Sequence, residues 1–186
     1  MSLAIALLAA GGATRFGGGK LDADCAGKPL GRWALDAARA VPHERLAVVV
    51  GDTAPAFARG CELLVNERAA EGLGTSAALA ARWAKSCDAL FIMLADMPLV
   101  SPETLHKLVE AGGPAAIAYP GHKPGAPACF PAALFPALGP LTGDSGAAQV
   151  LRGLAGVTLI ETAPEELRDV DRPEDLADVE ALLRSR

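Results

Sequence analysis

Short apolar runs alternate along the chain with segments in which apolar residues recur at helical spacing. The short runs are bounded by turn residues, which is typical of buried strands. They predict strands at 3–8, 46–50, 62–65, 89–95, 115–119 and 157–160. The other segments predict helices at 29–38, 54–59, 76–85, from 101 onward, and at 131–138, 145–153 and 173–184. The proline- and glycine-rich stretch 120–131 is predicted as a loop with a short strand near 128–130.

Strands that alternate with helices in this way build a mostly parallel sheet with helices on both faces. A chain of 186 residues, 51% of them hydrophobic, is long enough for one such domain with a sizeable core. We therefore expect a single α/β domain over residues 1–186. Ligands of such sheets bind beyond the carboxyl ends of the strands. Three segments are predicted there: the loop after the first strand, the loop that begins at Asn66, and the turn at Asp96.

Charge and composition exclude several classes of partner. A formal net charge of −5 disfavours tracking along nucleic-acid backbones or anionic membranes, and an aromatic content of 4% disfavours stacking on single strands. The four cysteines are far apart and show no zinc or iron–sulfur spacing, which fits a reducing cytoplasm. The apolar start lacks a basic region and is too short to span a bilayer. We expect a cytoplasmic protein that binds neither nucleic acid nor membranes.

A glycine-rich loop with two cations follows the first strand. Its glycines let backbone N–H groups approach an anion closely, and Arg15 and Lys20 add positive charge. The loop is not a P-loop, because Lys20 is followed by Leu21 and Thr14 stands where that motif requires its first glycine. It also lacks the GxGxxG pattern of dinucleotide-binding enzymes. These residues favour binding of a phosphate group, and a flexible strand-to-helix turn is the alternative.

Acidic residues at two places are candidates for a metal site. Asp96 ends an apolar strand, and Asp169 and Asp171 flank Val170 ahead of the last predicted helix. Mg²⁺ prefers one or two carboxylates together with phosphate oxygens, so Asp96 with a later aspartate suits a polyphosphate ligand. The alternatives are structural: Asp96 as a turn residue, and Asp171 with Glu174 as a capping box for the last helix.

Taken together, these pieces resemble the MobA-like nucleotidyltransferases. The segment 8–20 is similar to the family signature L-A-A-G-x-x-x-R-x-G-x-x-K. The other matching segments follow in the family's order: 27–30 (GKPL), Asn66, 72–76 (GLGTS), 94–98 (LADMP), 143–147 (GDSGA) and 169–175 (DVDRPED). They extend over nearly the whole chain. The likeness is greatest to the molybdenum cofactor cytidylyltransferases, with the guanylyltransferases next.

The resemblance implies a three-layer α/β/α, Rossmann-like fold of the nucleotidyltransferase type, whose mostly parallel sheet carries one antiparallel strand near its end. It implies Mg²⁺-dependent transfer of a nucleoside monophosphate to the terminal phosphate of molybdopterin, with release of pyrophosphate. CTP is the preferred nucleotide and GTP the alternative. A transient contact with a molybdoenzyme is implied as well.

The resemblance also assigns the residues of the site. Arg15, Lys20 and Asp96 would be catalytic, with the two cations on the triphosphate, and Asp96 and Asp171 would bind the metal. The residues that would bind the nucleotide are Leu8, Ala9, Ala10, Gly11, Gly12, Arg15, Lys20, Asn66, Gly74 and Ser76.

Departures from the family pattern leave the acceptor open. Glu67 replaces a proline, Ala148 replaces an arginine, and the acceptor segment 121–129 is altered. Lys123 or His122 could restore the lost positive charge. The alternatives are a guanylyltransferase for the same cofactor, nucleotidyl transfer to another phosphorylated acceptor, and, in a different class, a non-catalytic cofactor-binding chaperone for a molybdoenzyme.

Overall fold

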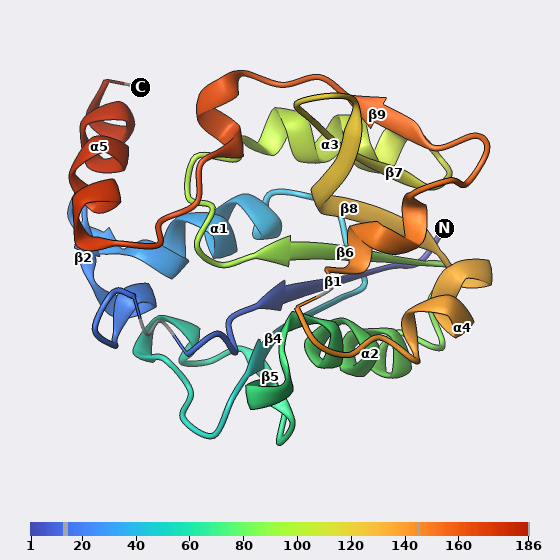
Figure 1. Ribbon diagram of the computed structural model, residues 1–186, viewed down its shortest axis with the longest axis horizontal. Coiled ribbons are helices and arrows are strands. Elements are labelled where there is room, and N and C mark those ends of the chain that lie inside the picture. The colour runs from blue at the N-terminus through green and yellow to red at the C-terminus, as the bar shows by residue number, and fades with distance from the viewer. Residues whose placement is uncertain (13–14, 145, 186) are drawn as a thin grey trace.

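The computed structural model describes residues 1–12, 15–144 and 146–185. Within them the chain forms a seven-stranded sheet in the order β5-β4-β1-β6-β8-β7-β9 (Figure 1). The strands are β1 (Leu3–Leu8), β4 (Arg45–Val50), β5 (Glu62–Val65), β6 (Ala89–Leu94), β7 (Ala115–Tyr119), β8 (Lys123–Pro131) and β9 (Thr158–Ile160). Thr14 of the predicted glycine-rich loop and Ser145 at the start of the predicted helix 145–153 lie outside the described residues.

One strand of this sheet runs against the others. β8 pairs antiparallel with both β6 and β7, whereas all other pairs of the described sheet are parallel. The prediction of a mostly parallel sheet with one antiparallel strand near its end is therefore confirmed.

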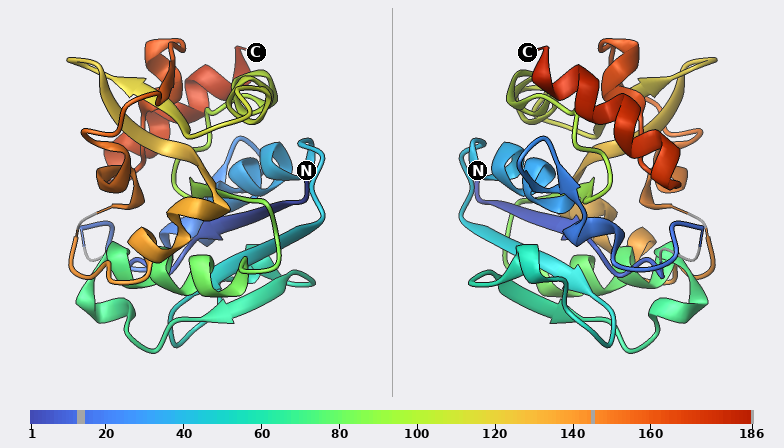
Figure 2. Two further views of the ribbon diagram at one scale, coloured as in Figure 1. Left: turned by 90° about the vertical axis from the view of Figure 1, so that its right-hand side faces the viewer. Right: turned by 90° about the vertical axis from the view of Figure 1, so that its left-hand side faces the viewer.

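Helices cover both faces of the sheet and give three layers. One face carries α1 (Leu30–Arg39) and α3 (Pro102–Glu110), and the other carries α2 (Leu73–Trp83) and α4 (Phe135–Leu138) (Figures 1 and 2). Successive residues of β1 belong alternately to the core on one face and the core on the other, because successive side chains of a strand point to opposite faces. Burial on both faces explains why β1 is a continuous apolar run. The predicted α/β/α Rossmann-like fold is confirmed.

A smaller third core lies where the central parallel strands end. It joins α5 (Pro173–Arg184) to a two-stranded ribbon of β2 (Asp24–Cys25) and β3 (Lys28–Pro29). Ala26 and Gly27 link the two strands with φ values of 53° and 88°, as a two-residue hairpin turn of this kind requires. Val170 is fully buried in this core, so the segment that leads into α5 is anchored near the end of the sheet.

Most predicted elements agree with the observed ones. The strands at 3–8, 62–65 and 115–119 and the helix at 173–184 coincide with β1, β5, β7 and α5. The helix expected from Ser101 is α3, and the Ser101 side chain accepts a hydrogen bond from Thr104 N as its cap. The other predicted short helices are mostly 3₁₀ turns: η2 (Ala56–Ala58), η4 (Ala132–Leu134) and η5 (Ala147–Leu151).

Two predicted boundaries are wrong. The strand expected near 128–130 is part of β8, but β8 extends over most of the loop expected at 120–131, and its register on β7 leaves Ala126 and Pro127 unpaired in an irregularity. Such irregularities accept prolines that a regular inner strand excludes, so composition alone suggests a loop. The helix expected at 76–85 begins at Leu73, because the glycines on either side of Leu73 serve close packing of another loop rather than a turn.

The described residues include no helix with the length and apolar character needed to cross a membrane. The four cysteines are free thiols, and three of them are buried.

Candidate active site

The carboxyl ends of two neighbouring strands bring four of the predicted site residues together. Asp96 follows β6, and Arg15 and Lys20 follow β1, which lies next to β6 in the sheet. Asp171 comes from the segment before α5. This segment is held at the Asp96 turn, because Val170 N donates a hydrogen bond to Asp96 O at 3.0 Å.

Lys20 lies at the centre of an ion network. Its Nζ donates to Asp96 Oδ2 at 2.8 Å and lies 3.7 Å from Asp171 Oδ1. Arg15 Nη1 donates to the other oxygen of Asp171 at 3.0 Å. The side chains of Lys20 and Asp96 are 10% and 24% exposed, whereas that of Arg15 is 73% exposed. Solvent therefore screens the Arg15–Asp171 pair much more than the Lys20–Asp96 pair.

The loop that carries Lys20 is tied down by Asp22, a residue that the sequence analysis missed. The two carboxylate oxygens of Asp22 accept hydrogen bonds from Ala56 N at 2.7 Å and Phe57 N at 2.8 Å. Gly19, with a left-handed φ of 64°, turns the chain into the short 3₁₀ helix η1 (Lys20–Asp22). The backbone of Lys20 is thus fixed from both sides, by the glycine turn and by the contact with η2.

Asp171 is not the helix cap that its spacing suggests. The N-cap of α5 is Arg172, and Asp175 Oδ2 accepts hydrogen bonds from the backbone N–H groups of Asp171 and Arg172 at 2.9 and 2.7 Å. The capping box therefore begins one residue later than the predicted Asp171–Glu174 pair. The Asp171 carboxylate therefore takes no part in the cap and belongs to the ion network.

Asp169 brings a third carboxylate near the network. Partial desolvation, together with the charges of Asp96 and Asp171, raises the pKa of Asp169. Burial, together with the charges of Asp169 and Asp96, raises the pKa of Tyr119 to about 12. The Tyr119 hydroxyl donates a hydrogen bond to Ala126 O at 3.2 Å. The acidic cluster of Asp96, Asp169 and Asp171 thus lies within electrostatic reach of the Tyr119 ring.

The donor set suits a hard divalent cation that arrives with a phosphate. Asp96 and Asp171 both face Lys20 Nζ, so their oxygens converge on one position that already holds a positive charge. Carboxylate oxygens are the ligands that Mg²⁺ and Mn²⁺ prefer. In the part of the chain that the structure describes, no three Asp, Glu, His or Cys side chains form a ready ligand set. Phosphate oxygens would have to complete the coordination, as is common for Mg²⁺.

Asn66 and Ser76, both predicted to bind nucleotide, are buried partners of each other. Asn66 Nδ2 donates to Ser76 Oγ at 2.9 Å and to Thr75 Oγ1 at 2.8 Å, and its Oδ1 accepts from Arg68 N at 3.1 Å. All three interacting side chains are buried. They join the end of β5 to the start of α2. Their contact with a nucleotide stays a prediction.

Gly74 lies where two loops meet in backbone contact. Its N–H donates to Gly143 O at 2.9 Å, and a Cβ atom there would lie 2.7 Å from Thr142 N and 2.8 Å from Thr142 O. Gly72, with φ of 106°, would place a Cβ atom 2.3 Å from Gly143 C. The two glycines let the segment around Gly143 pack directly on the start of α2.

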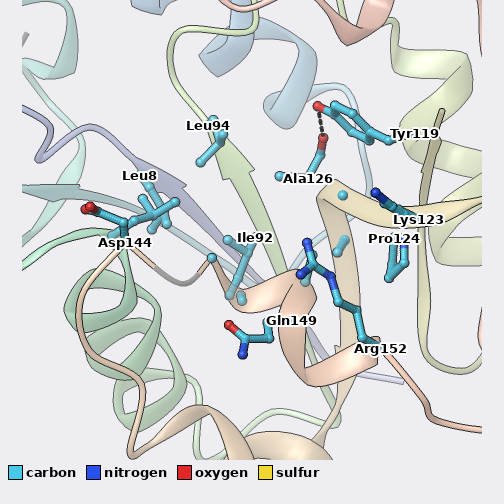
Figure 3. Close-up of a pocket in the computed structure, with 16 residues that line it drawn as sticks. Leu8, Ile92, Leu94, Tyr119, Lys123, Pro124, Ala126, Asp144, Gln149 and Arg152 are labelled. Carbon is cyan, nitrogen blue, oxygen red and sulfur yellow. Dashed lines mark hydrogen bonds between the residues drawn. The ribbon is translucent and has the colours of Figure 1, made fainter. Parts of the chain in front are cut away.

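A cavity of about 670 Å³ opens beside the ends of β1 and β6 (Figure 3). Leu8, Ile92 and Leu94 of these strands form part of its apolar wall, and the β7–β8 hairpin contributes Tyr119 and Lys123. The remaining wall comes from Leu73, from residues 144 and 146–149, and from Arg152. Both altered parts of the sequence, 121–129 and the segment around Ala148, therefore contribute to one cavity.

The predicted nucleotide-binding segment 8–12 begins in the sheet and ends in a second cavity. Leu8 O accepts a hydrogen bond from Ala95 N at 3.0 Å, and Ala9 N donates to Val49 O at 2.8 Å. Beyond Ala10, the chain leaves the sheet. Ala9, Gly11, Gly12, Lys20 and residues 53–55 line a cavity of about 310 Å³.

Of the two residues weighed as replacements for a lost cation, only one lies at the large cavity. Lys123 lines it, whereas the exposed His122 has its Nδ1 3.5 Å from Glu161 Oε1. Arg152, which the sequence did not single out, also lines the cavity. The hint in the sequence is that Arg152 comes four residues after Ala148, and Ala148 stands where the family pattern has an arginine.

Solved structures show that this is the fold of nucleotidyltransferases. The crystal structure of the Rv0371c homologue from Mycobacterium sp. strain JC1 has a TM-score of 0.85 and 25% identity, and covers 99% of this chain and 98% of that one. A nucleotidyl transferase from Methanothermobacter thermautotroptrophicus has a TM-score of 0.83 and 21% identity, with coverage of 100% and 99%. Rv0371c of Mycobacterium tuberculosis H37Rv, in complex with manganese, has a TM-score of 0.76 and 24% identity, with coverage of 97% and 99%.

The chain belongs to the MobA-like NTP transferase domain family, which residues 5–167 match. The purine catabolism protein PucB of Bacillus subtilis is 32% identical in an alignment that covers 90% of this chain and 91% of PucB. The bifunctional protein GlmU of Geobacter metallireducens is 35% identical over 120 residues, or 60% of this chain. That match spans 25% of the length of GlmU.

Proposed function

We propose that this protein transfers CMP from CTP to the terminal phosphate of molybdopterin in the presence of Mg²⁺, with release of pyrophosphate. The observation that supports this most is the convergence of Arg15, Lys20, Asp96 and Asp171 at the carboxyl ends of β1 and β6. A nucleoside triphosphate with a divalent cation needs fixed charges of both signs at one place. We further propose that residues 1–186 form a single catalytic domain that works in the cytoplasm, where its free thiols persist.

Nucleotide binding exchanges the partners of the ion network. The triphosphate takes Arg15 and Lys20 from the carboxylates, which leaves Asp96 and Asp171 as the residues that would hold a divalent cation. When bound, this ion polarises the α-phosphate as a Lewis acid. The chain segment 8–12 and the smaller cavity beside it hold the base and ribose. CTP is proposed ahead of GTP because the motifs resemble those of cytidylyltransferases most.

The reaction is an in-line displacement at the α-phosphorus. An oxygen of the acceptor phosphate forms the new bond to phosphorus, the bond to the bridging oxygen of the β-phosphate breaks, and pyrophosphate leaves. The protein contributes positioning and neutralisation of charge, so no Ser-His-Asp or Cys-His arrangement is needed. Arg15 and Lys20 stabilise the negative charge that grows on the pyrophosphate.

The acceptor occupies the larger cavity. Its volume of about 670 Å³, its apolar wall and the Tyr119 ring suit a large flat heterocycle such as a pterin. The cavity also reaches Leu94, two residues before Asp96, so a bound acceptor can direct its phosphate toward the ion network. A molybdoenzyme that receives the product is the proposed transient partner.

A second candidate is a role in purine catabolism. It is favoured by the similarity to PucB, which extends over 90% of this chain.

The test is turnover with CTP, GTP, ATP and UTP, each with Mg²⁺ and molybdopterin, with pyrophosphate as the readout. We expect CTP to be used best. Lys20→Met and Asp96→Asn should each lose roughly 10²–10³-fold in rate or more. Lys28→Met is the matched control, because Lys28 Nζ also donates to an aspartate, Asp36, at 2.7 Å, but outside the site.

Three results would contradict the proposal in different ways. Pyrophosphate release with another phosphorylated acceptor but not with molybdopterin would retain the chemistry and change the acceptor. Binding of nucleotide and molybdopterin without any release would favour a cofactor-binding chaperone. Near-normal turnover in Lys20→Met or Asp96→Asn would remove these residues from the reaction.

A further inference from the structure

The large cavity contains two cations for which the proposed reaction has no role. Lys123 comes from the β7–β8 hairpin and Arg152 follows η5, and both line the cavity. Figure 3 shows that the two side chains extend toward the same part of it. In the ranges that the structure describes, neither Lys123 nor Arg152 forms an ion pair. Two positive charges thus face one space without a counter-ion from the described chain.

These cations stand apart from the site of phosphoryl chemistry. The lining of the cavity includes none of the residues of the ion network, Arg15, Lys20, Asp96 and Asp171. The acidic residue of the lining, Asp144, lies on the opposite side, beside Leu8 (Figure 3). An acceptor that fills the cavity and presents its reacting phosphate to the ion network would therefore place another part of itself against Lys123 and Arg152.

We infer that Lys123 and Arg152 form a subsite for a second anionic group of the acceptor, distinct from the phosphate that reacts. This inference rests on the proposed transfer to a phosphorylated acceptor. A guanidinium offers planar paired donors and an ammonium offers a compact charge, and the two together suit a phosphate, a carboxylate or the ene-dithiolate of molybdopterin. The acceptor class is thus a phosphorylated molecule that carries a further anion.

Both cations are exposed side chains, and their shared place in the lining of one cavity distinguishes them from scattered surface charges. Lys123 pairs with Tyr119 across the hairpin, and the Tyr119 ring lies so close to Gly125 that a Cβ atom there would be 2.2 Å from it. The hairpin that carries Lys123 is therefore closely packed. Because both side chains are exposed, solvent screens each charge, and attraction for an anion comes from the two cations acting together beside the apolar wall.

Tyr119 provides a direct probe of this subsite, because it is the single tyrosine of the chain. Protein labelled with 3-fluorotyrosine has one ¹⁹F signal, and this signal reports from the cavity wall. The full chain is first saturated with Mg²⁺ and a non-hydrolysable CTP analogue, which keeps added anions away from Arg15 and Lys20. Inorganic phosphate is then titrated while the ¹⁹F shift is followed.

Two variants test the subsite and two serve as controls. We expect Lys123→Ala and Arg152→Ala each to raise the Kd for phosphate roughly two- to fivefold, since each removes one solvent-screened charge. The KM for molybdopterin should rise by a similar factor, while the KM for CTP stays unchanged. Lys85→Ala and Arg82→Ala remove exposed cations outside the cavity and should leave the phosphate titration unchanged.

The outcomes separate this inference from the proposed function. If phosphate causes no shift in the unsubstituted protein, or if all four variants bind it alike, the subsite does not exist, whatever the turnover assay shows. If the phosphate shift depends on Lys123 and Arg152 but molybdopterin is not turned over, the subsite stands and the proposed acceptor is wrong.

Discussion

Replacing Lys20 with methionine is expected to strengthen metal binding while it removes catalysis. In the nucleotide-free protein, Lys20 Nζ donates to Asp96 Oδ2 at 2.8 Å and lies 3.7 Å from Asp171 Oδ1. A divalent cation that binds these carboxylates before the nucleotide arrives has to displace the ammonium group of Lys20. Methionine keeps an unbranched apolar chain in a site where Lys20 is 10% exposed, and it leaves both carboxylates without this competitor.

The size of the effect follows from the contacts of Lys20. A hydrogen bond between charged groups is worth about 1.5–3 kcal/mol, and about 1.4 kcal/mol corresponds to a tenfold change in affinity. The Lys20–Asp96 pair is largely shielded from solvent, so screening reduces this only modestly. We therefore expect Lys20→Met to bind Mn²⁺ alone roughly 10–100-fold more tightly than the unsubstituted protein.

The assay is a titration with Mn²⁺ followed by electron paramagnetic resonance of the free ion, without nucleotide. Lys28→Met is the control, because its ion pair with Asp36 lies outside the site, and it should leave Mn²⁺ affinity unchanged. Turnover of Lys20→Met should still fall roughly 10²–10³-fold. Unchanged or weaker Mn²⁺ binding in Lys20→Met would refute the idea that Lys20 and the metal compete for Asp96 and Asp171.

Three further predictions concern the surroundings of the site. Gly74→Ala pushes a methyl group against the backbone of Thr142, so it should lower stability by about 1–3 kcal/mol in urea unfolding and raise the acceptor KM; Gly113→Ala, with open space around it, should do neither. The pKa of Tyr119 is raised to about 12, so its absorbance at ~295 nm should titrate well above the usual midpoint near ~10, and an ordinary midpoint would contradict the burial described. The pKa of Asp169 is raised, so its charge disfavours the folded state at neutral pH and Asp169→Asn should stabilise the protein there; this gain should shrink as pH falls and vanish below about 4, where the carboxyl is protonated in both states, and a gain independent of pH would count against the acidic cluster.

The sequence predicts the parts of the protein that depend on local pattern. β1 and β6 are buried on both faces, so they are continuous apolar runs that fit few structures other than a buried strand. Because these strands are parallel neighbours, the residues that follow them meet at one edge of the sheet. The proximity of Lys20 to Asp96 could be anticipated for this reason, although the direct ion pair could not.

Other features depend on contacts between distant segments and leave no local signal. The prolines of β8 suggest a loop, and only its pairing with β6 and β7 makes it a strand. Asp22 resembles any surface aspartate until the fold places η2 against it. Asp171 and Asp175 both fit a capping pattern, and the exact start of α5 decides between them. Arg152 belongs to the cavity only because η5 packs beside β8.

In the proposed site, Arg15 and Lys20 bind the triphosphate while Asp96 and Asp171 hold the divalent cation. A crystal structure with CTP and Mn²⁺, with anomalous data for manganese, tests it most directly. We expect a manganese peak between the carboxylates of Asp96 and Asp171, with the triphosphate against Arg15 and Lys20. A manganese peak or a triphosphate bound away from these four residues would contradict it.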